Sequence, residues 1–135
     1  MFTSETKIRV RYAETDRMGF VYYGNYAQYF EVGRVEALRK ISFSYKALED
    51  SGIFLPVLDY SVKFSKPALY DDLLTVETCI PEVPAARIKF LYRTMNEQGV
   101  ELNNAQTTLV FVNRKTNKPC VAPEEFLTKI SEFFV

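Results

Sequence analysis

Residues 15–26 read TDRMGFVYYGNY, and this stretch decides the fold because two kinds of secondary structure meet in it. Before it, Lys7 to Tyr12 alternates charged with apolar side chains, which is the period of a strand with one buried face. After it, from Tyr22 to Ile41, apolar residues recur at helical spacing. Asp16 and Gly19 mark a turn between the two segments. The sequence therefore predicts a strand that passes through a tight turn into a long helix.

The predicted helix has one apolar face, formed by Tyr26, Phe30, Gly33, Ala37 and Ile41. Its polar residues are expected to point elsewhere; they are Gln28, Glu31, Arg34, Arg39 and Lys40. A glycine inside a helix costs ~1 kcal/mol relative to alanine. Gly33 therefore either allows close approach of a sheet or another helix, or is merely tolerated.

The rest of the chain predicts four more strands and two more helices. A short helix carries Tyr45 to Glu49, with Ser42 or Ser44 as its cap and Ser51-Gly52 as its end. Extended segments cover residues 54–64, 73–80, 87–94 and 102–112, and a last amphipathic helix begins at Pro123 to Glu125. Because short turns rather than helices join the strands, we expect an α+β fold in which a five-stranded antiparallel sheet wraps around the long central helix.

Length and composition restrict the possible function. A chain of 135 residues predicts one domain, residues 1–135, able to bury its own core. Hydrophobic residues make up 47% and aromatic residues 15% of the chain, which suggests a self-association surface or an apolar pocket. Seventeen basic residues balance 17 acidic ones, so the strong positive charge of a nucleic-acid-binding domain is absent.

The cysteines and the N-terminus predict a cytoplasmic protein without a metal centre. Cys79 and Cys120 have no metal-binding spacing, and the chain contains no histidine, so reduced thiols are the simplest interpretation. Residues 1–7 lack the apolar core of a signal peptide, and no apolar run approaches the ~20 residues needed to cross a bilayer. We therefore expect no metal and no membrane partner.

The motif from Tyr12 to Tyr22, with the helix residues Tyr26, Tyr29 to Glu31 and Arg34 to Glu36, resembles the hotdog-fold acyl-CoA thioesterases. The similar branch is the 4-hydroxybenzoyl-CoA thioesterases and their YbgC-type relatives, and Asp-x-x-Gly-x-Val-Tyr is its most specific element. Leu55 to Val57, Lys66 to Leu73 and Arg114 to Pro119 extend the match. The resemblance implies a hotdog fold and subunits that pair into one continuous sheet. It also implies a homodimer, or a homotetramer built as a dimer of dimers, with active sites between subunits.

The same resemblance assigns roles within the turn. Asp16 matches the catalytic aspartate, which acts on a thioester either as general base or as nucleophile. Without the resemblance, Asp16 reads as a turn or capping residue. Tyr23 matches the position whose backbone N–H stabilises the oxyanion at the helix start. Gly19 either lets the acyl group come near the main chain or is an ordinary turn glycine.

The chain departs from many relatives because Tyr23 stands where they carry a histidine. A carboxylate-only mechanism remains compatible with the sequence, whereas the hotdog dehydratases, which pair a histidine with an acid, are disfavoured. Glu31 and Glu36 are rival carboxylates, since a second group of hotdog thioesterases places its acid on the central helix. They lie on different helix faces, and the spacing of Glu31 and Arg34 suggests a structural ion pair.

Substrate-binding residues are predicted in two places. Leu55, Pro56 and Val57 match family positions that line the substrate site, although plain strand core explains them equally well. Pro56 also favours an edge or irregular backbone. Arg87 and Lys89 share a strand face and are candidates for holding the phosphates of coenzyme A. Further basic candidates are Lys63, Lys66, Arg114 and Lys115.

The sequence thus predicts an acyl-CoA thioesterase that releases a free carboxylic acid and coenzyme A without a cofactor. The alternative is a non-catalytic module that binds acyl groups or acyl-CoA on the same fold. A regulator of this fold normally needs an attached DNA-binding segment, and we expect none in 135 residues. The acyl group, whether aromatic, short or long, is left open.

Overall fold

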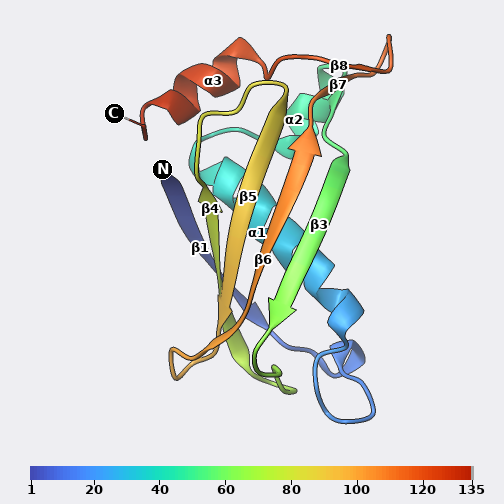
Figure 1. Cartoon of the computed structure of the whole chain (residues 1–135), viewed down its shortest axis with the longest axis vertical. Helices are drawn as coiled ribbons and strands as arrows, with labels where there is room; N and C mark the ends of the chain where they lie inside the picture. Colours follow the sequence, from blue (N-terminus) through green and yellow to red (C-terminus); the bar gives the residue numbers. More distant parts are fainter. Residues whose placement is uncertain (135) are drawn as a thin grey trace.

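The computed structural model describes residues 1–134 and shows an antiparallel sheet that wraps around one long helix (Figure 1). The helix is α1 (Tyr26–Lys40). The strands are β1 (Phe2–Arg9), β3 (Val57–Phe64), β4 (Leu73–Ile80), β5 (Arg87–Met95) and β6 (Glu101–Val110). They lie in the order β1-β4-β5-β6-β3, and every neighbouring pair is antiparallel. The predicted α+β class and five-stranded sheet are confirmed.

Helix α1 is held against the sheet by aromatic stacking and by one very close contact. The ring of Phe30 stacks on that of Tyr92 in β5, with centroids 4.6 Å apart. A Cβ atom built at Gly33 lies 2.5 Å from Oγ1 of Thr78 and 3.2 Å from Cγ1 of Val76, both in β4. Gly33 therefore permits the close approach of helix and sheet, and it is not merely tolerated.

Arg34 does not point away from the sheet, so this part of the sequence prediction is wrong. Only 7% of Arg34 is exposed, and its Nη1 donates a hydrogen bond to the Tyr92 hydroxyl at 3.1 Å. The expected ion pair between Glu31 and Arg34 is not among those formed within residues 1–134. Because the sheet curls around α1, it covers a wider stripe of the helix than the apolar residues alone indicate.

The first strand begins earlier and ends earlier than the sequence predicts. Its register with β4 runs from Phe2 opposite Ile80 to Arg9 opposite Leu73. The chain then leaves the sheet, and Tyr12, 78% exposed, begins the 3₁₀ turn η1 (Tyr12–Glu14). The alternation of charged and apolar residues does not reveal the start of β1, because a polar residue, Ser4, faces inward there.

The segment predicted as one strand from 54 to 64 is broken at Pro56. The part before it, β2 (Ile53–Phe54), pairs with β7 (Val112–Asn113), and β7 pairs with β8 (Lys118–Pro119), so a small second sheet forms that the sequence did not indicate. Proline has no N–H for a ladder hydrogen bond, but the Pro56 carbonyl accepts one from the N–H of Val110. The break separates the two sheets.

The remaining predicted helices form. Helix α2 (Tyr45–Asp50) is capped by Ser44, whose Oγ accepts a hydrogen bond from the N–H of Ala47 at 3.3 Å. Helix α3 (Glu124–Ser131) closes the end of the molecule near β8 (Figure 1). Within residues 1–134, no helix combines the length and the apolar character needed to cross a membrane.

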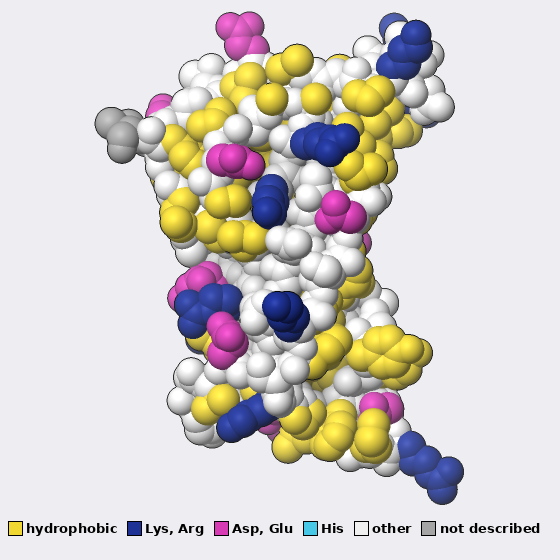
Figure 2. Space-filling view, in the orientation of Figure 1, with side chains coloured by type: hydrophobic (Ala, Val, Ile, Leu, Met, Phe, Trp, Pro, Cys, Tyr) yellow, Lys and Arg dark blue, Asp and Glu magenta, His cyan; other side chains and the backbone are white. Residues whose placement is uncertain are grey.

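Strand β3 forms one edge of the large sheet, paired only with β6 in the part of the chain that the structure describes. Four apolar side chains of this strand are 40–51% exposed; they are Val57, Leu58, Tyr60 and Phe64. Figure 2 shows hydrophobic side chains gathered on the side of the molecule where β3 lies. An uncovered apolar edge strand is a ready template for pairing with another chain.

The contact at Gly33 predicts an unusual effect of alanine. Gly33→Ala should lower the free energy of unfolding by about 1–3 kcal/mol, because overpacking against Thr78 outweighs the ~1 kcal/mol that alanine normally adds to a helix. Urea unfolding followed by circular dichroism measures this change. Adding Thr78→Ala should restore most of the loss, whereas equal stability of Gly33→Ala and the wild type contradicts the close contact.

Candidate active site

Asp16 lies in a compact loop closed by main-chain hydrogen bonds. The N–H of Asp16 donates to the Phe20 carbonyl at 2.7 Å, and the N–H of Gly19 donates to the Asp16 carbonyl at 3.0 Å. Gly19 has φ +81°, a left-handed conformation that favours glycine. The loop is fastened to the segment after β3 by the hydrogen bond from Val21 N–H to the Ala68 carbonyl at 2.8 Å.

The loop orients the carboxylate of Asp16 through one of its two oxygens. Oδ1 accepts hydrogen bonds from the N–H of Met18 at 2.9 Å and from that of Phe20 at 3.2 Å. Among residues 1–134, no group donates to Oδ2. One oxygen therefore fixes the side chain while the other is free to accept a proton or to attack a carbonyl carbon.

The start of the helical segment supplies hydrogen-bond donors. The short 3₁₀ turn η2 (Tyr23–Asn25) continues directly into α1. No acceptor within the described part of the chain takes the N–H of Tyr23 or Gly24, as is normal for the first positions of a helix. These N–H groups lie at the positive end of the helix dipole, where negative charge is stabilised.

Asp16 and Tyr23 line the same surface hollow, whose volume is about 260 Å³. Tyr26 of α1 and Phe64 at the end of β3 form apolar walls, and Lys66 adds a positive charge. A free carboxylate oxygen, unpaired N–H donors and an apolar wall are the parts needed to cleave a polarised carbonyl compound.

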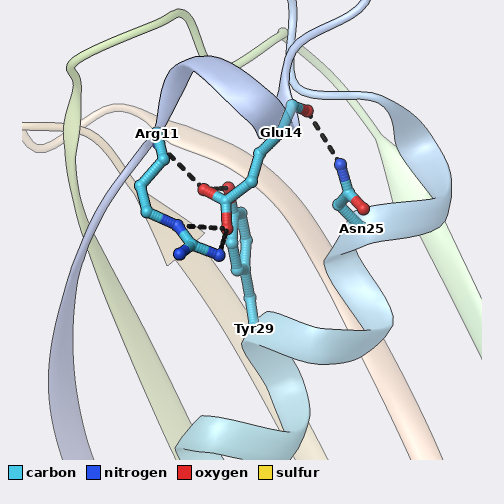
Figure 3. A network of polar contacts seen from close by, with 4 residues as sticks. All are labelled: Arg11, Glu14, Asn25 and Tyr29. Atoms are coloured by element: carbon cyan, nitrogen blue, oxygen red, sulfur yellow. Dashed lines mark hydrogen bonds and ion pairs between the residues drawn. The ribbon is translucent and has the colours of Figure 1, made fainter.

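A buried carboxylate, Glu14, connects the loop to the helix (Figure 3). Its Oε1 accepts hydrogen bonds from the N–H of Arg11 at 2.8 Å and from the hydroxyl of Tyr29 at 2.9 Å. Its Oε2 pairs with the guanidinium of Arg11 at 3.2 Å. Its backbone carbonyl accepts hydrogen bonds from Asn25 Nδ2 at 2.8 Å and from Tyr22 N–H at 2.9 Å.

These contacts shift the pKa values of the Glu14 carboxyl and the Tyr29 hydroxyl. Burial alone raises the pKa of Glu14, but the hydrogen bonds from Arg11 and Tyr29 together outweigh it and hold the pKa below its usual value. Burial and the facing Glu14 carboxylate raise the pKa of Tyr29. Glu14 is therefore a charged acceptor and Tyr29 a neutral donor at neutral pH.

The sequence does not indicate that Glu14 and Tyr29 contact each other near the active site. One signal was present, because Arg11 and Glu14 stand three residues apart just ahead of the turn, as in a capping box. The contact with Tyr29 depends on how α1 passes the turn, which the sequence does not show.

The predicted substrate residues Leu55, Pro56 and Val57 do not lie beside Asp16 in one chain. They line a different hollow of about 410 Å³, together with Glu31 and the buried Arg34. Val57 and Phe64 are the two ends of β3, roughly 23 Å apart at about 3.3 Å per residue. Phe64 belongs to the Asp16 hollow, so the two hollows flank opposite ends of the edge strand.

Arg87 and Lys89 also lie far from Asp16 within the chain. Lys89 pairs with Thr108, next to Leu109, which is the partner of Val57. Both basic residues alternate with the buried Ile88 and therefore face away from α1. Of the other predicted basic residues, Lys66 lines the Asp16 hollow, and Lys63 lines a hollow on the outer face of the sheet.

The residues that the structure describes contain no group of three or more His, Cys, Asp or Glu side chains placed to hold a metal ion. Cys79 and Cys120 are free thiols.

Comparison with known proteins identifies a family that matches most of the chain. The model of the thioesterase-like superfamily matches residues 10–130. The putative acyl-CoA thioesterase YneP of Bacillus subtilis is 34% identical over 119 residues, covering 88% of this chain and 86% of that protein. The acyl-CoA thioester hydrolase YbgC of Escherichia coli O157:H7 is 30% identical over 125 residues, covering 93% of each chain.

A solved structure agrees with these matches. The DHNA-CoA thioesterase from Staphylococcus aureus superposes with a TM-score of 0.94 at 34% identity, covering 99% of this chain and 92% of that one. The predicted hotdog fold is thereby confirmed.

The low pKa of Glu14 predicts a loss of stability in acid. A carboxylate whose pKa is lowered by folding stabilises the fold above its unfolded value, here 4.5, and loses this contribution as the pH falls through the folded pKa. Glu14→Gln should lower the free energy of unfolding by about 2 kcal/mol at pH 7, where a buried charged acceptor is lost. The difference from the wild type should shrink below pH 4.5. Urea titrations from pH 3 to pH 7 measure it, and a pH-independent difference contradicts the charged state of Glu14.

Proposed function

This chain belongs to the thioesterase-like superfamily, and we propose that it is an acyl-CoA thioesterase that hydrolyses a thioester to a free carboxylic acid and coenzyme A. The observation that carries the proposal is that Asp16, with one oxygen that accepts no hydrogen bond among residues 1–134, lines the same hollow as Tyr23 at the start of η2. The names of YneP and YbgC support acyl-CoA as the substrate class.

In the proposed reaction, the thioester carbonyl lies between Asp16 and the start of η2. The free oxygen of Asp16 either removes a proton from an attacking water or attacks the carbonyl carbon itself. The N–H of Tyr23 stabilises the negative charge that develops on the carbonyl oxygen. The carbon–sulfur bond then breaks, and coenzyme A leaves as a thiolate that takes up a proton. In the general-base route the attacking water gives the free acid directly, whereas in the nucleophilic route a second step, in which water hydrolyses the anhydride between the acyl group and Asp16, releases the acid and regenerates the carboxylate. No histidine takes part because the chain contains none.

We further propose that two copies pair through the exposed edge of β3. An antiparallel pairing extends the sheet across both subunits and covers the apolar side chains Leu58 and Tyr60. In the symmetric register centred between Tyr60 and Ser61, Phe64 lies opposite Val57 of the partner subunit.

This pairing joins the two separate hollows. The Asp16 hollow ends at Phe64, and the hollow with Leu55, Pro56 and Val57 begins at the other end of β3. A two-fold axis between the two β3 strands places the Leu55–Val57 hollow of one subunit next to the Asp16 hollow of its partner. The predicted substrate-binding residues then reach the reacting carboxylate from the neighbouring chain.

The same two-fold pairing brings Arg87 and Lys89 closer to the proposed catalytic aspartate of the partner subunit. Arg87 and Lys89 are level with Val57 in the sheet, so pairing moves them to the end where the partner's Asp16 lies. They remain our candidates for holding the phosphates of coenzyme A, with Lys66 of the Asp16 hollow as a third cation. A tetramer of two such dimers is compatible with the exposed outer face of the sheet.

Asp16→Asn tests the catalytic role. The variant keeps the size of the side chain but removes the base or nucleophile, so kcat/KM should fall at least 30-fold, equivalent to about 2–3 kcal/mol. Thiol release from short, long and aromatic acyl-CoAs measures the loss and also defines the preferred acyl group. Glu31→Gln serves as the comparison, because the Glu31 carboxylate is the rival acid and lines the other hollow, and the salt bridges within residues 1–134 do not include the one expected between Glu31 and Arg34.

Two results overturn this proposal. An Asp16→Asn enzyme with full activity removes Asp16 from the mechanism, and a loss seen only in Glu31→Gln transfers the role to the central helix. Tight binding of acyl-CoA by a wild-type protein that releases no thiol establishes the alternative function, a non-catalytic binding module.

Leu58→Lys tests the proposed subunit contact. A lysine on the edge of β3 opposes strand pairing, so the protein should elute as a monomer and lose activity together with its oligomeric state. Val121→Lys is the matched control, since Val121 is also an exposed apolar residue but lies outside β3. Size-exclusion chromatography with light scattering gives the mass. A Leu58→Lys protein that stays oligomeric and active contradicts the β3 contact.

A further inference from the structure

We infer that Glu14 is a positioning residue for the reaction, which holds the Asp16 loop and the start of η2 in one fixed relation. The inference rests on the proposed function, because it assigns Glu14 an effect on that reaction. Glu14 does not line the Asp16 hollow and therefore acts through its neighbours.

The carboxylate of Glu14 connects the segment that leaves β1 to the first turn of α1. The N–H and guanidinium of Arg11 come from the segment that leaves β1, and the Tyr29 hydroxyl comes from the first turn of α1 (Figure 3). Glu14 is 8% exposed, so these bonds form where little water competes. Both oxygens are occupied, which leaves the side chain a single favourable orientation.

The main chain of Glu14 makes the second connection. Its carbonyl accepts the Tyr22 N–H, one residue before the proposed oxyanion donor Tyr23, and also the side-chain amide of Asn25 within η2. Glu14 itself precedes the proposed catalytic Asp16 by two residues. Asp16 is thus two residues from Glu14 along the main chain, and Tyr23 directly follows Tyr22, whose N–H is bonded to the Glu14 carbonyl.

The surface around the loop gives few other constraints. Met18 is 70% exposed and Tyr23 68%, so their side chains do not anchor the chain. The loop has its own internal hydrogen bonds, but these fix its shape rather than its place beside η2. The place of the loop is set by the Glu14 contacts together with those of its last residues: Val21 is buried in the core and bonded to Ala68, and Phe20 forms a β-bridge with Leu69. Of these, only the Glu14 contacts reach the start of η2 and α1.

Loss of this connection should affect turnover more than substrate binding. In the proposed site, coenzyme A is held by Arg87, Lys89 and Lys66 rather than by Glu14, whereas the barrier depends on the alignment of Asp16 with the Tyr23 N–H. A displacement of about 1 Å in such a pair costs up to about 100-fold in rate. The structure therefore predicts a fall in kcat with little change in KM.

The experiment compares Glu14→Gln and Tyr29→Phe in the full-length protein. Glu14→Gln preserves shape but presents an amide N–H₂ to Arg11, and kcat should fall about 10-fold or more with KM within about 2-fold. Tyr29→Phe removes one hydrogen bond and should reduce kcat by about 3-fold. Glu125→Gln is the matched control, because Glu125 forms an exposed ion pair with Lys129 in α3, and its kinetics should equal those of the wild type.

A double variant separates positioning from general stability. If Glu14 acts through Asp16, adding Glu14→Gln to Asp16→Asn should lower the residual rate by no more than about 3-fold. Rates are taken at a temperature where circular dichroism shows every variant folded. Full multiplication of the two losses, or a Glu14→Gln enzyme with wild-type kcat, overturns the inference.

The outcome is distinct from that of the proposed function. A wild-type protein without thioesterase activity refutes the function itself. An active wild type whose Asp16→Asn variant is inactive, while Glu14→Gln is unimpaired, refutes only the role of Glu14.

Discussion

The close contact between α1 and β4 at Gly33 is the constraint on which the rest of the structure depends. With no side chain between the Gly33 backbone and Thr78, the helix lies at a fixed distance from the sheet. At this distance the ring of Phe30 stacks on that of Tyr92 in β5, the strand next to β4. Once the helix is fixed along its axis, its first N–H groups occupy one place. The loop around Asp16 must span from the end of β1 to this fixed start of the helix, and this determines where Asp16 lies.

The proposed active site is assembled mostly from backbone groups, so the proposed mechanism needs no histidine. Backbone N–H groups of Met18 and Phe20 orient the Asp16 carboxylate. In the proposed mechanism, backbone N–H groups at the start of η2 stabilise the developing charge. Such donors need no particular side chain, but they need a rigid frame. The Glu14 contacts supply that frame at the point where the loop meets the helix.

Much of the fold followed from periodicity, and the failures have physical causes. The bounds of β4 were predictable because three of its inward positions, Leu74, Val76 and Ile80, are apolar. The start of β1 was not, since Ser4 is turned inward, and the break at Pro56 was read as irregularity rather than as a boundary between two sheets. Arg34 was misplaced because burial of a charged residue depends on the curvature of the sheet and on the Tyr92 hydroxyl, neither of which a helical pattern contains.

The site illustrates a limit of another kind. A motif identified Asp16 and Tyr23, which are close in sequence and line one hollow, but Leu55 to Val57 lie at the far end of β3. No folding of one chain can unite them, because both ends of a strand are rigidly separated. A two-fold pairing along that strand reverses the ends and resolves the contradiction without moving any residue. The uncovered apolar edge of β3 and the divided set of predicted substrate residues both support our proposal that a complete site is shared by two chains.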